Sequence, residues 1–369
     1  MVGAVCPDAA GPGDDRPFGV YVHVPFCARR CAYCAFATWT DRAHLMERYA
    51  RACVAEVGAA GLGPASSLFF GGGTPSLLPA AALAAIVAAV PLAPGAEVTV
   101  ECNPDDVTPH LLATYRAAGV TRISLGVQSL LPHVLASLGR AHDPAVARRA
   151  ARTVAAAGFA SWSVDLIFGA VGESAADWVA TLDGVLALGP PHVSAYALTV
   201  EPGTPLAADP ARRPDDDDQA DKYLVADEAL ARAGLASYEV SNWARPGHEC
   251  RHNTLYWSQG DYRGIGCAAH SHQAGRRWWN VRTPERYIER VETGRSAEAA
   301  GERLGVDERR REGLQLALRT RAGVPADAFD GTGADGLAGL DGLIEQRGER
   351  VVLTPKGRLL GNEIALRLR

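Results

Sequence analysis

The sequence contains almost no lysine and has no excess of positive charge. Only Lys222 and Lys356 are lysines among 37 basic residues, and the 369-residue chain has a formal net charge of −5. Domains that bind nucleic acid through its phosphates usually present a basic surface. The composition therefore argues against a nucleic-acid partner.

Long apolar runs are also missing. No stretch of about 18 apolar residues is free of glycine, proline and charge, so we expect no transmembrane helix. Residues 1–17 have neither a basic start nor an apolar run, so we expect no signal peptide and a cytoplasmic location. Clustered cysteines in that compartment are more often metal ligands or catalytic groups than disulfide partners.

Short β-branched runs alternate with alanine- and leucine-rich segments over the first part of the chain. The strand-like runs are GVYVHV, SLFFGGG, EVTVECNP, TRISLGVQS, SWSVDLIFG and HVSAYALTV. Six β/α repeats predict a parallel sheet, because parallel strands need crossover helices. The periodicity leaves open a doubly wound sheet or a partial barrel. In both folds the chemistry collects at the carboxyl ends of the strands.

The alternation stops after about residue 200. The acidic run in RRPDDDDQADKY predicts the start of a helix, because acidic side chains stabilise helix N-termini. Four regions are expected: a flexible tail (1–17), the sheet domain (18–240), an irregular segment rich in Trp, Tyr, His and Gly (241–304), and a winged-helix-like domain (305–369). That last domain should contain a hairpin around Arg347 and Gly348.

The most informative motif is HVPFCARRCAYCAFAT, in which Cys27, Cys31 and Cys34 are spaced C-x₃-C-x₂-C. Three thiolates can hold three irons of a [4Fe–4S] cluster and leave the fourth iron open to a small ligand. The alternatives are zinc and buried structural cysteine. Structural zinc sites close all four positions, usually with two separated cysteine pairs, so the spacing favours the cluster.

With this motif the chain resembles the radical S-adenosylmethionine (SAM) superfamily. YVHVPFC, FFGGGTPSLL, ECNP, RISLGVQS, LGRAH, VDLIFG and HNTLYW also occur in the order found in relatives of oxygen-independent coproporphyrinogen III oxidase. The resemblance implies a partial (β/α)₆ TIM-like barrel of α/β class, a [4Fe–4S] cluster and bound SAM.

The resemblance also implies which residues bind SAM along the strand ends. Glycine lets backbone groups approach a ligand closely, and an arginine suits a carboxylate. Glu101, Gln128 and Asp165 end strands and are expected to bind the ammonium group or the ribose, without a fixed assignment between them. For each residue the alternative is an ordinary structural role at a strand end. The implied set is Tyr21, Tyr33, Gly72, Gly73, Thr74, Glu101, Gln128, Arg140 and Asp165.

Two departures from the oxidase point to a sister branch, the HemW-type haem chaperones. The oxidase has a further cysteine two positions after the third, where this chain has Phe36, and a longer N-terminal segment before the first strand. In the chaperone branch an H-N-x-x-Y-W motif is tied to haem binding, which implies His252 as a haem ligand. Imidazole is a standard axial ligand of haem iron. The alternative is a histidine whose hydrogen bonds are satisfied beside core aromatic residues.

We therefore expect a protein that binds haem and delivers it to acceptor apo-haem proteins, such as those of the respiratory chain. The rivals are a radical SAM oxidase acting on coproporphyrinogen III and a cluster protein with another tetrapyrrole substrate. Whether the chain is an enzyme stays open, because all three hypotheses share the same cluster.

Overall fold

The computed structural model of the chain describes residues 17–329 and 337–368. The expected tail lies outside these residues except for Pro17. The apolar runs form parallel strands that pair in chain order, from β1 to β6. A doubly wound sheet would reverse its strand order, so this sequential order identifies the partial barrel. The strands are β1 (Phe18–Val24), β2 (Ala65–Gly72), β3 (Leu92–Cys102), β4 (Arg122–Gln128), β5 (Ser161–Phe168) and β6 (His192–Ala197).

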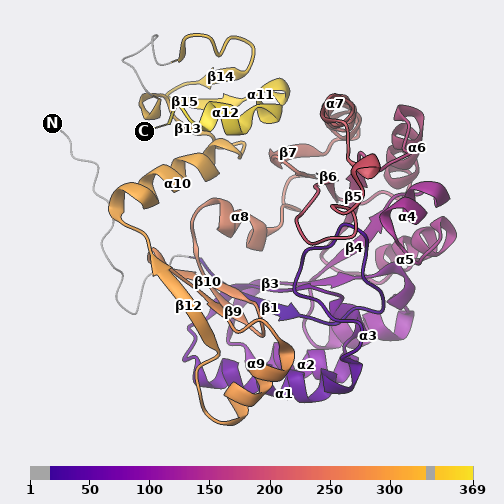
Figure 1. Ribbon diagram of the computed structural model, residues 1–369, viewed down its shortest axis with the longest axis vertical. Coiled ribbons are helices and arrows are strands. Elements are labelled where there is room, and N and C mark those ends of the chain that lie inside the picture. Colours follow the sequence, from indigo (N-terminus) through magenta and orange to yellow (C-terminus); the bar gives the residue numbers. More distant parts are fainter. Residues whose placement is uncertain (1–16, 330–336, 369) are drawn as a thin grey trace.

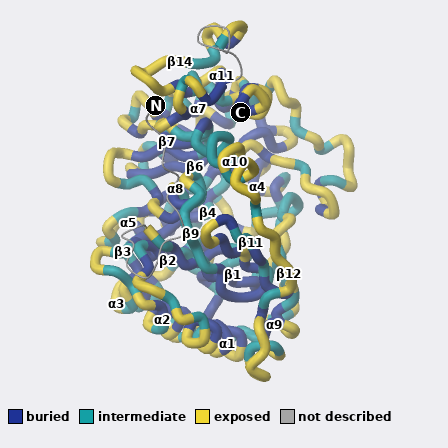
Figure 2. The backbone as a smooth tube through the Cα atoms, turned by 90° about the vertical axis from the view of Figure 1, so that its left-hand side faces the viewer, coloured by how far each residue is buried: buried dark blue, intermediate teal, exposed yellow. Residues whose placement is uncertain are grey.

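Helices follow the strands and cover the outer side of the curved sheet (Figure 1). Buried residues concentrate along the strands, whereas exposed residues gather on the surrounding helices (Figure 2). The core therefore lies between the sheet and this helical layer. The helices are α1 (Met46–Ala59), α2 (Ala80–Ala89), α3 (Pro109–Ala117), α4 (Pro132–Leu138), α5 (Pro144–Ala156), α6 (Ala175–Leu186) and α7 (Asp216–Arg232).

The helix starts follow the local signals in the sequence. Thr108 precedes the proline that begins α3, and its hydroxyl accepts a hydrogen bond from the backbone amide of Leu111. In the acidic run, Asp215 caps α7 by accepting the amide of Asp218, so its role as a helix N-terminus is confirmed. Helix α4 was not expected, because its short apolar pattern between β4 and α5 is only two turns long.

The segment 241–304, expected to be irregular, instead extends the barrel sheet. Strand β9 pairs in parallel with β1, and β10, β11 and β12 continue outward from it. The prediction was wrong because these strands carry histidine, arginine and tryptophan in place of alternating apolar residues. The elements are β7 (Ala236–Glu239), β8 (Asn242–Ala244), α8 (Arg251–Trp257), β9 (Asp261–Ile265), β10 (His270–Gln273), β11 (Arg276–Asn280), α9 (Pro284–Glu292) and β12 (Glu298–Arg303).

The expected boundary at residue 240 falls inside a strand pair. Strand β8 pairs with β7 on one side and with β6 on the other, so both belong to the barrel sheet. The barrel sheet therefore continues past the sequence-based boundary.

The C-terminal region has a hydrophobic core of its own, above the barrel in Figure 1. The expected hairpin is present as β14 and β15, whereas the winged-helix assignment stays a prediction. Arg358 ties this region to α7 through Asp227 and the hydroxyl of Tyr223. The elements are α10 (Val306–Leu318), β13 (Val324–Pro325), β14 (Ile344–Arg347), β15 (Arg350–Leu353), α11 (Pro355–Leu359) and α12 (Gly361–Ala365).

The described residues include no helix that is both long and apolar enough to span a membrane.

A buried tyrosine joins the barrel to strands β9–β12, which we call the added strands. The hydroxyl of Tyr49, on α1, donates to the carbonyl of His23 at 2.7 Å and accepts the amide of Cys267 at 2.8 Å. Tyr49→Phe leaves both backbone groups buried without this partner, so we expect a loss of about 1–3 kcal/mol in the free energy of unfolding. Urea unfolding measures it as a lower midpoint.

Tyr115 supplies a matched control. It is equally buried, yet its hydroxyl has no hydrogen-bond partner among the described residues. Tyr115→Phe should leave stability unchanged or raise it, because it removes a buried polar group that lacks a partner. Equal losses in the two variants would contradict the linking role of Tyr49.

Candidate functional site

All the residues predicted to bind the cluster, SAM or haem line one cavity of about 750 Å³, which we call the strand-end cavity. Parallel strands end at the same edge of the barrel, so residues more than 200 positions apart in the sequence meet there. The structure thus places these residues together, and their individual ligands stay predictions. They are Tyr21, Cys27, Cys31, Tyr33, Cys34, Gly72, Gly73, Thr74, Glu101, Gln128, Arg140, Asp165 and His252.

The motif cysteines differ from the other described cysteines in exposure. Cys27, Cys31 and Cys34 are partly exposed to the cavity, whereas the remaining described cysteines are buried. Desolvation raises the pKa of the Cys27 and Cys34 thiols, so both are protonated at neutral pH when no metal is bound. Metal binding at these positions would release protons.

The thiols do not converge on a single point. Among residues 17–329 and 337–368, no three His, Cys, Asp or Glu side chains are grouped as they would be around one metal ion. The Cys27 sulfur contacts the Thr74 hydroxyl at 3.5 Å, and the Cys31 sulfur contacts the Arg140 guanidinium at 3.6 Å. In a [4Fe–4S] cluster each thiolate binds a different iron, so the thiols need not converge.

The glycine run after β2 packs against the cysteine loop. The Gly73 amide donates to the Val24 carbonyl at 2.7 Å, and the Thr74 amide donates to the Phe26 carbonyl at 2.8 Å. A Cβ on Gly73 would lie 2.7 Å from both carbonyls, and Gly72 has a φ of +106°. Glycine is therefore required here by the approach of the cysteine loop, a reason independent of any ligand.

Two carboxyl groups face the cavity with little compensating charge. Burial and the nearby charge of Asp165 raise the pKa of Glu101 to about 8. Asp165 accepts hydrogen bonds from Ser124 and Ser194, each at 2.7 Å, and burial raises its pKa as well. The serines were missed in the sequence, because only their strand positions bring them beside Asp165. The pair offers a binding place for a cationic group.

Arg140 and Gln128 line the same cavity. Arg140 donates to the carbonyl of Gly126 at 3.0 Å and to the side chain of Asn103, while its Nε lacks a partner among the described residues. Gln128 follows a register shift in β4 and has a φ of +66°. A positive φ is uncommon for a residue with a side chain and often marks a functional site.

His252 closes the strand-end cavity from α8. Its exposed fraction is 1%, and its ring stacks on Phe69 with centroids 5.3 Å apart. Nδ1 is hydrogen bonded to the Ser67 hydroxyl at 2.9 Å and Nε2 to the Tyr256 hydroxyl at 2.8 Å. Burial lowers the pKa of His252 to about 3, so the ring is neutral. These contacts correspond to the alternative considered from the sequence, a histidine satisfied within the core.

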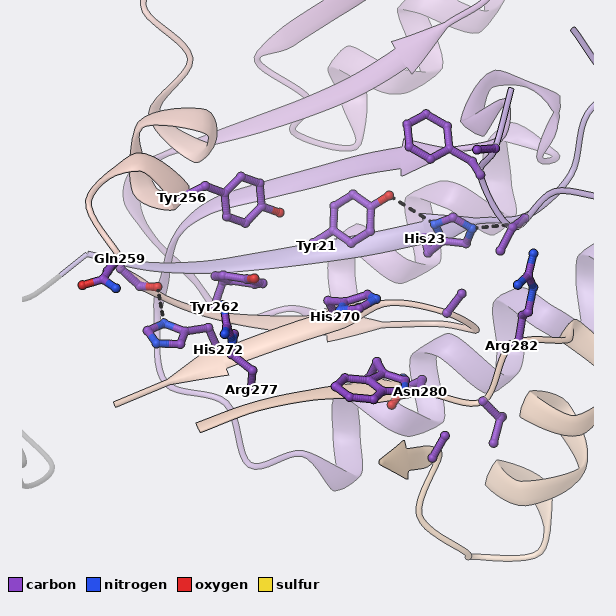
Figure 3. A pocket seen from close by; sticks show the side chains of 18 of the residues that line it. Tyr21, His23, Tyr256, Gln259, Tyr262, His270, His272, Arg277, Asn280 and Arg282 are labelled. Carbon is purple, nitrogen blue, oxygen red and sulfur yellow. Dashed lines mark hydrogen bonds between the residues drawn. The ribbon is translucent and has the colours of Figure 1, made fainter. Parts of the chain in front are cut away.

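A second and larger cavity, of about 1100 Å³, lies against the added strands β9–β11, and we call it the edge-strand cavity. Figure 3 shows part of its lining, with Tyr21 and His23 from β1 and His270 and Arg277 from β10 and β11. Both cavities are lined by Tyr21, Ala35, Phe36 and Tyr256, so they share a wall. This cavity was not predicted from the sequence, because the strands that form it were not expected.

Comparisons with known proteins agree with this geometry. The model of the radical SAM superfamily matches residues 21–185. A protein of Mycobacterium tuberculosis named "Heme chaperone HemW" is 44% identical over 96% of this chain and 95% of its own length. A protein of the same name from Synechocystis is 38% identical over 84% of this chain and 79% of its own length.

The solved structure of coproporphyrinogen III oxidase from Escherichia coli, described as a radical SAM enzyme, superimposes with a TM-score of 0.81. It is 25% identical, and the alignment covers 95% of this chain and 89% of the oxidase. The barrel, the cavity lined by three thiols and these relatives lead to one conclusion. This chain belongs to the HemW haem chaperone family of the radical SAM superfamily.

Proposed function

We propose that this protein binds haem and transfers it to acceptor apoproteins, and that it carries a [4Fe–4S] cluster with SAM. The observation that carries the proposal is the likeness to proteins named haem chaperone, which extends over 96% of the chain. The convergence of every predicted cofactor residue on the strand-end cavity supports it.

Cys27, Cys31 and Cys34 would hold the cluster, since they are the described cysteines that both line the strand-end cavity and are partly exposed. Bound there, the cluster would supply an iron that lacks a protein ligand and can accept SAM. Glu101 and Asp165 would accept hydrogen bonds from the SAM ammonium or ribose. Arg140 would donate to its carboxylate.

The remaining predicted residues would shape the site around SAM. Gly72, Gly73 and Thr74 hold the cysteine loop in place, as their backbone contacts indicate. Tyr21 and Tyr33 would supply aromatic walls of the cavity, and Gln128 would offer it an amide group.

The role of His252 in haem binding is less direct than a bond to iron. Both of its ring nitrogens are hydrogen bonded, so ligation would require one bond to break. Through Nε2 the ring orients the hydroxyl of Tyr256, which lines both cavities. We propose that His252 acts on haem binding by positioning Tyr256.

We further propose that the protein works in the cytoplasm and that its acceptors are haem proteins of the respiratory chain. The radical SAM oxidase is the competing function, favoured by the structural likeness to coproporphyrinogen III oxidase. Phe36 argues against it, because a phenyl ring cannot replace the thiol of the oxidase at this position.

The two functions are separated by one side-by-side experiment on the cluster-loaded protein. With haem we expect saturable binding and transfer of the bound haem to an apo-haem protein, followed by absorbance. With coproporphyrinogen III, SAM and a reductant we expect no sustained formation of protoporphyrinogen IX. Many turnovers of that substrate, without haem transfer, would replace the chaperone by the oxidase.

The cluster assignment predicts which cysteines are needed. Anaerobic reconstitution should give about four irons and four sulfides per chain. Alanine at Cys27, Cys31 or Cys34 should abolish the cluster, as measured by iron and sulfide content and by absorbance. Cys102→Ala is the control, because its buried thiol borders the same cavity. A cluster that needs Cys102 and tolerates loss of a motif cysteine would refute the assignment.

The raised pKa of Glu101 predicts a trade-off between stability and SAM binding. An unfolded glutamate loses its proton near pH 4.5, whereas folded Glu101 keeps it up to about pH 8. In this window the folded chain binds more protons, so stability falls as pH rises. In the protein without SAM, Glu101→Gln should remove this fall in stability and so raise the melting temperature at pH 8 relative to wild type. The same substitution should weaken SAM binding.

Thermal unfolding from about pH 5 to 8 and calorimetric titration with SAM test both halves of this prediction. Glu201→Gln is the matched control, because Glu201 lines the same cavity at its exposed rim. We expect the control to keep the wild-type pH dependence and SAM affinity. Unchanged SAM affinity in Glu101→Gln would exclude Glu101 from the SAM site.

A further inference from the structure

The edge-strand cavity has the size and lining of a site for a large, flat ligand. Its volume of about 1100 Å³ slightly exceeds the usual range for small-molecule sites, about 300 to 1,000 Å³. It has no part in the cluster and SAM site described above, apart from the shared wall. It therefore offers room for a ligand other than the cluster and SAM.

The histidines that line this cavity differ in whether their ring nitrogens are hydrogen bonded. The ring nitrogens of His23 are hydrogen bonded to the Tyr21 hydroxyl and the Ala37 carbonyl. Those of His272 are hydrogen bonded to the Gly260 carbonyl and the Gly275 amide. Neither ring can bind iron without losing a contact.

His270 is free of such contacts. It is the first residue of β10, it is exposed to the cavity, and its ring makes no hydrogen bond with any residue that the structure describes. The ring stacks on Trp279 of β11 with centroids 5.7 Å apart, which holds its plane in place. Desolvation and the nearby Arg277 lower the pKa of His270, so a nitrogen lone pair is available at neutral pH.

Large apolar surfaces lie around this imidazole. Phe36, two positions after Cys34, is 67% exposed and lines the cavity. Trp279, Tyr262 and Leu316 line it as well. Flat aromatic rings such as these pack well on the face of a macrocycle.

Unpaired arginines complete the lining. Arg282 and Arg286 are exposed at the cavity, and their guanidinium groups form no ion pair or hydrogen bond within the described ranges. Arg277, by contrast, is paired with Glu302 and Glu312. Two free guanidinium groups suit two carboxylates, because each can bind a carboxylate through paired donors.

We propose that haem binds in the edge-strand cavity, with His270 as the axial ligand of its iron. The macrocycle lies against Phe36 and Trp279, and the propionates lie near Arg282 and Arg286. The inference rests on the proposed function and specifies its site. His252 is then a positioning residue, since its bond to Tyr256 reaches the wall between the two cavities.

The first test follows the iron ligand in the full-length protein. His270→Ala should lose the imidazole-ligated ferric spectrum and bind haem about tenfold or more weakly. Its affinity for iron-free protoporphyrin IX should stay within about twofold of wild type, because that ligand has no iron to coordinate. His270→Tyr should give a phenolate-ligated spectrum, as an oxygen ligand replaces the nitrogen.

Two histidine variants serve as comparisons. His133→Ala removes an exposed histidine far from the cavity and should bind haem as wild type does. His252→Gln should keep the imidazole-ligated spectrum, because its ring is not the ligand. The proposal is wrong if His270→Ala keeps that spectrum, or if His252→Gln loses it.

The second test addresses the propionates. The double variant Arg282→Gln/Arg286→Gln should bind haem about ten- to a hundredfold more weakly, and it should bind haem dimethyl ester as wild type does. Arg310→Gln/Arg311→Gln has the same charge change on α10, at residues that do not line the cavity, and should leave haem affinity unchanged. If both double variants bound haem equally weakly, the cause would be the change in overall charge. That result would overturn the assignment of Arg282 and Arg286 to the propionates.

The behaviour of the wild-type protein distinguishes a failure of the proposed haem site from a failure of the proposed haem chaperone function. If wild type binds and transfers haem while the His270 variants are normal, the edge-strand site is wrong and the haem chaperone function stands. If wild type binds no haem, the proposed function itself fails.

Discussion

The site depends on a backbone contact between the glycine run after β2 and the loop that carries the cysteines. The amides of Gly73 and Thr74 bond to the carbonyls of Val24 and Phe26, and a side chain on Gly73 would collide with both carbonyls. Because Cys27 follows Phe26 directly, this contact fixes where the cysteine loop leaves β1. The thiols are thereby held over the strand ends that supply Glu101 and the other polar groups of the cavity.

A shared wall divides the functional end of the barrel into two compartments. Tyr21, Phe36 and Tyr256 each line both cavities, so a cofactor on one side and a tetrapyrrole on the other would be separated by single aromatic rings. The HNTLYW motif belongs to this wall, because His252 holds the Tyr256 hydroxyl and stacks on Phe69. A role in haem binding and a fully buried histidine are then compatible, since the ring would act through Tyr256.

The strand-end cavity contains two buried carboxyl groups whose negative charge a cationic ligand would balance. Glu101 and Asp165 lie close together, and burial raises the pKa of both. A ligand with a cationic group would favour their ionised forms, and its binding would also stabilise the fold, because ligands that bind only the folded state shift the folding equilibrium. The same holds for the protonated thiols, which a cluster would convert to thiolates. The empty protein is therefore less stable than a loaded one, and the cofactors are part of its folding balance.

Local patterns in the sequence predicted the barrel strands, the helix start at Thr108 and the helix after the acidic run, and the rule that parallel strands end together predicted where the chemistry would collect. The individual residues around the strand-end cavity came from the family resemblance, because no local pattern identifies them. The pairing of β9 with β1 depends on the tertiary structure, because β9–β11 carry polar and aromatic side chains on a face that lines a cavity. The tertiary structure also decided which imidazole is free. The sequence motif favours His252 over His270, but hydrogen bonds from distant Ser67 and neighbouring Tyr256 occupy the His252 ring, and none from a described residue occupies the His270 ring.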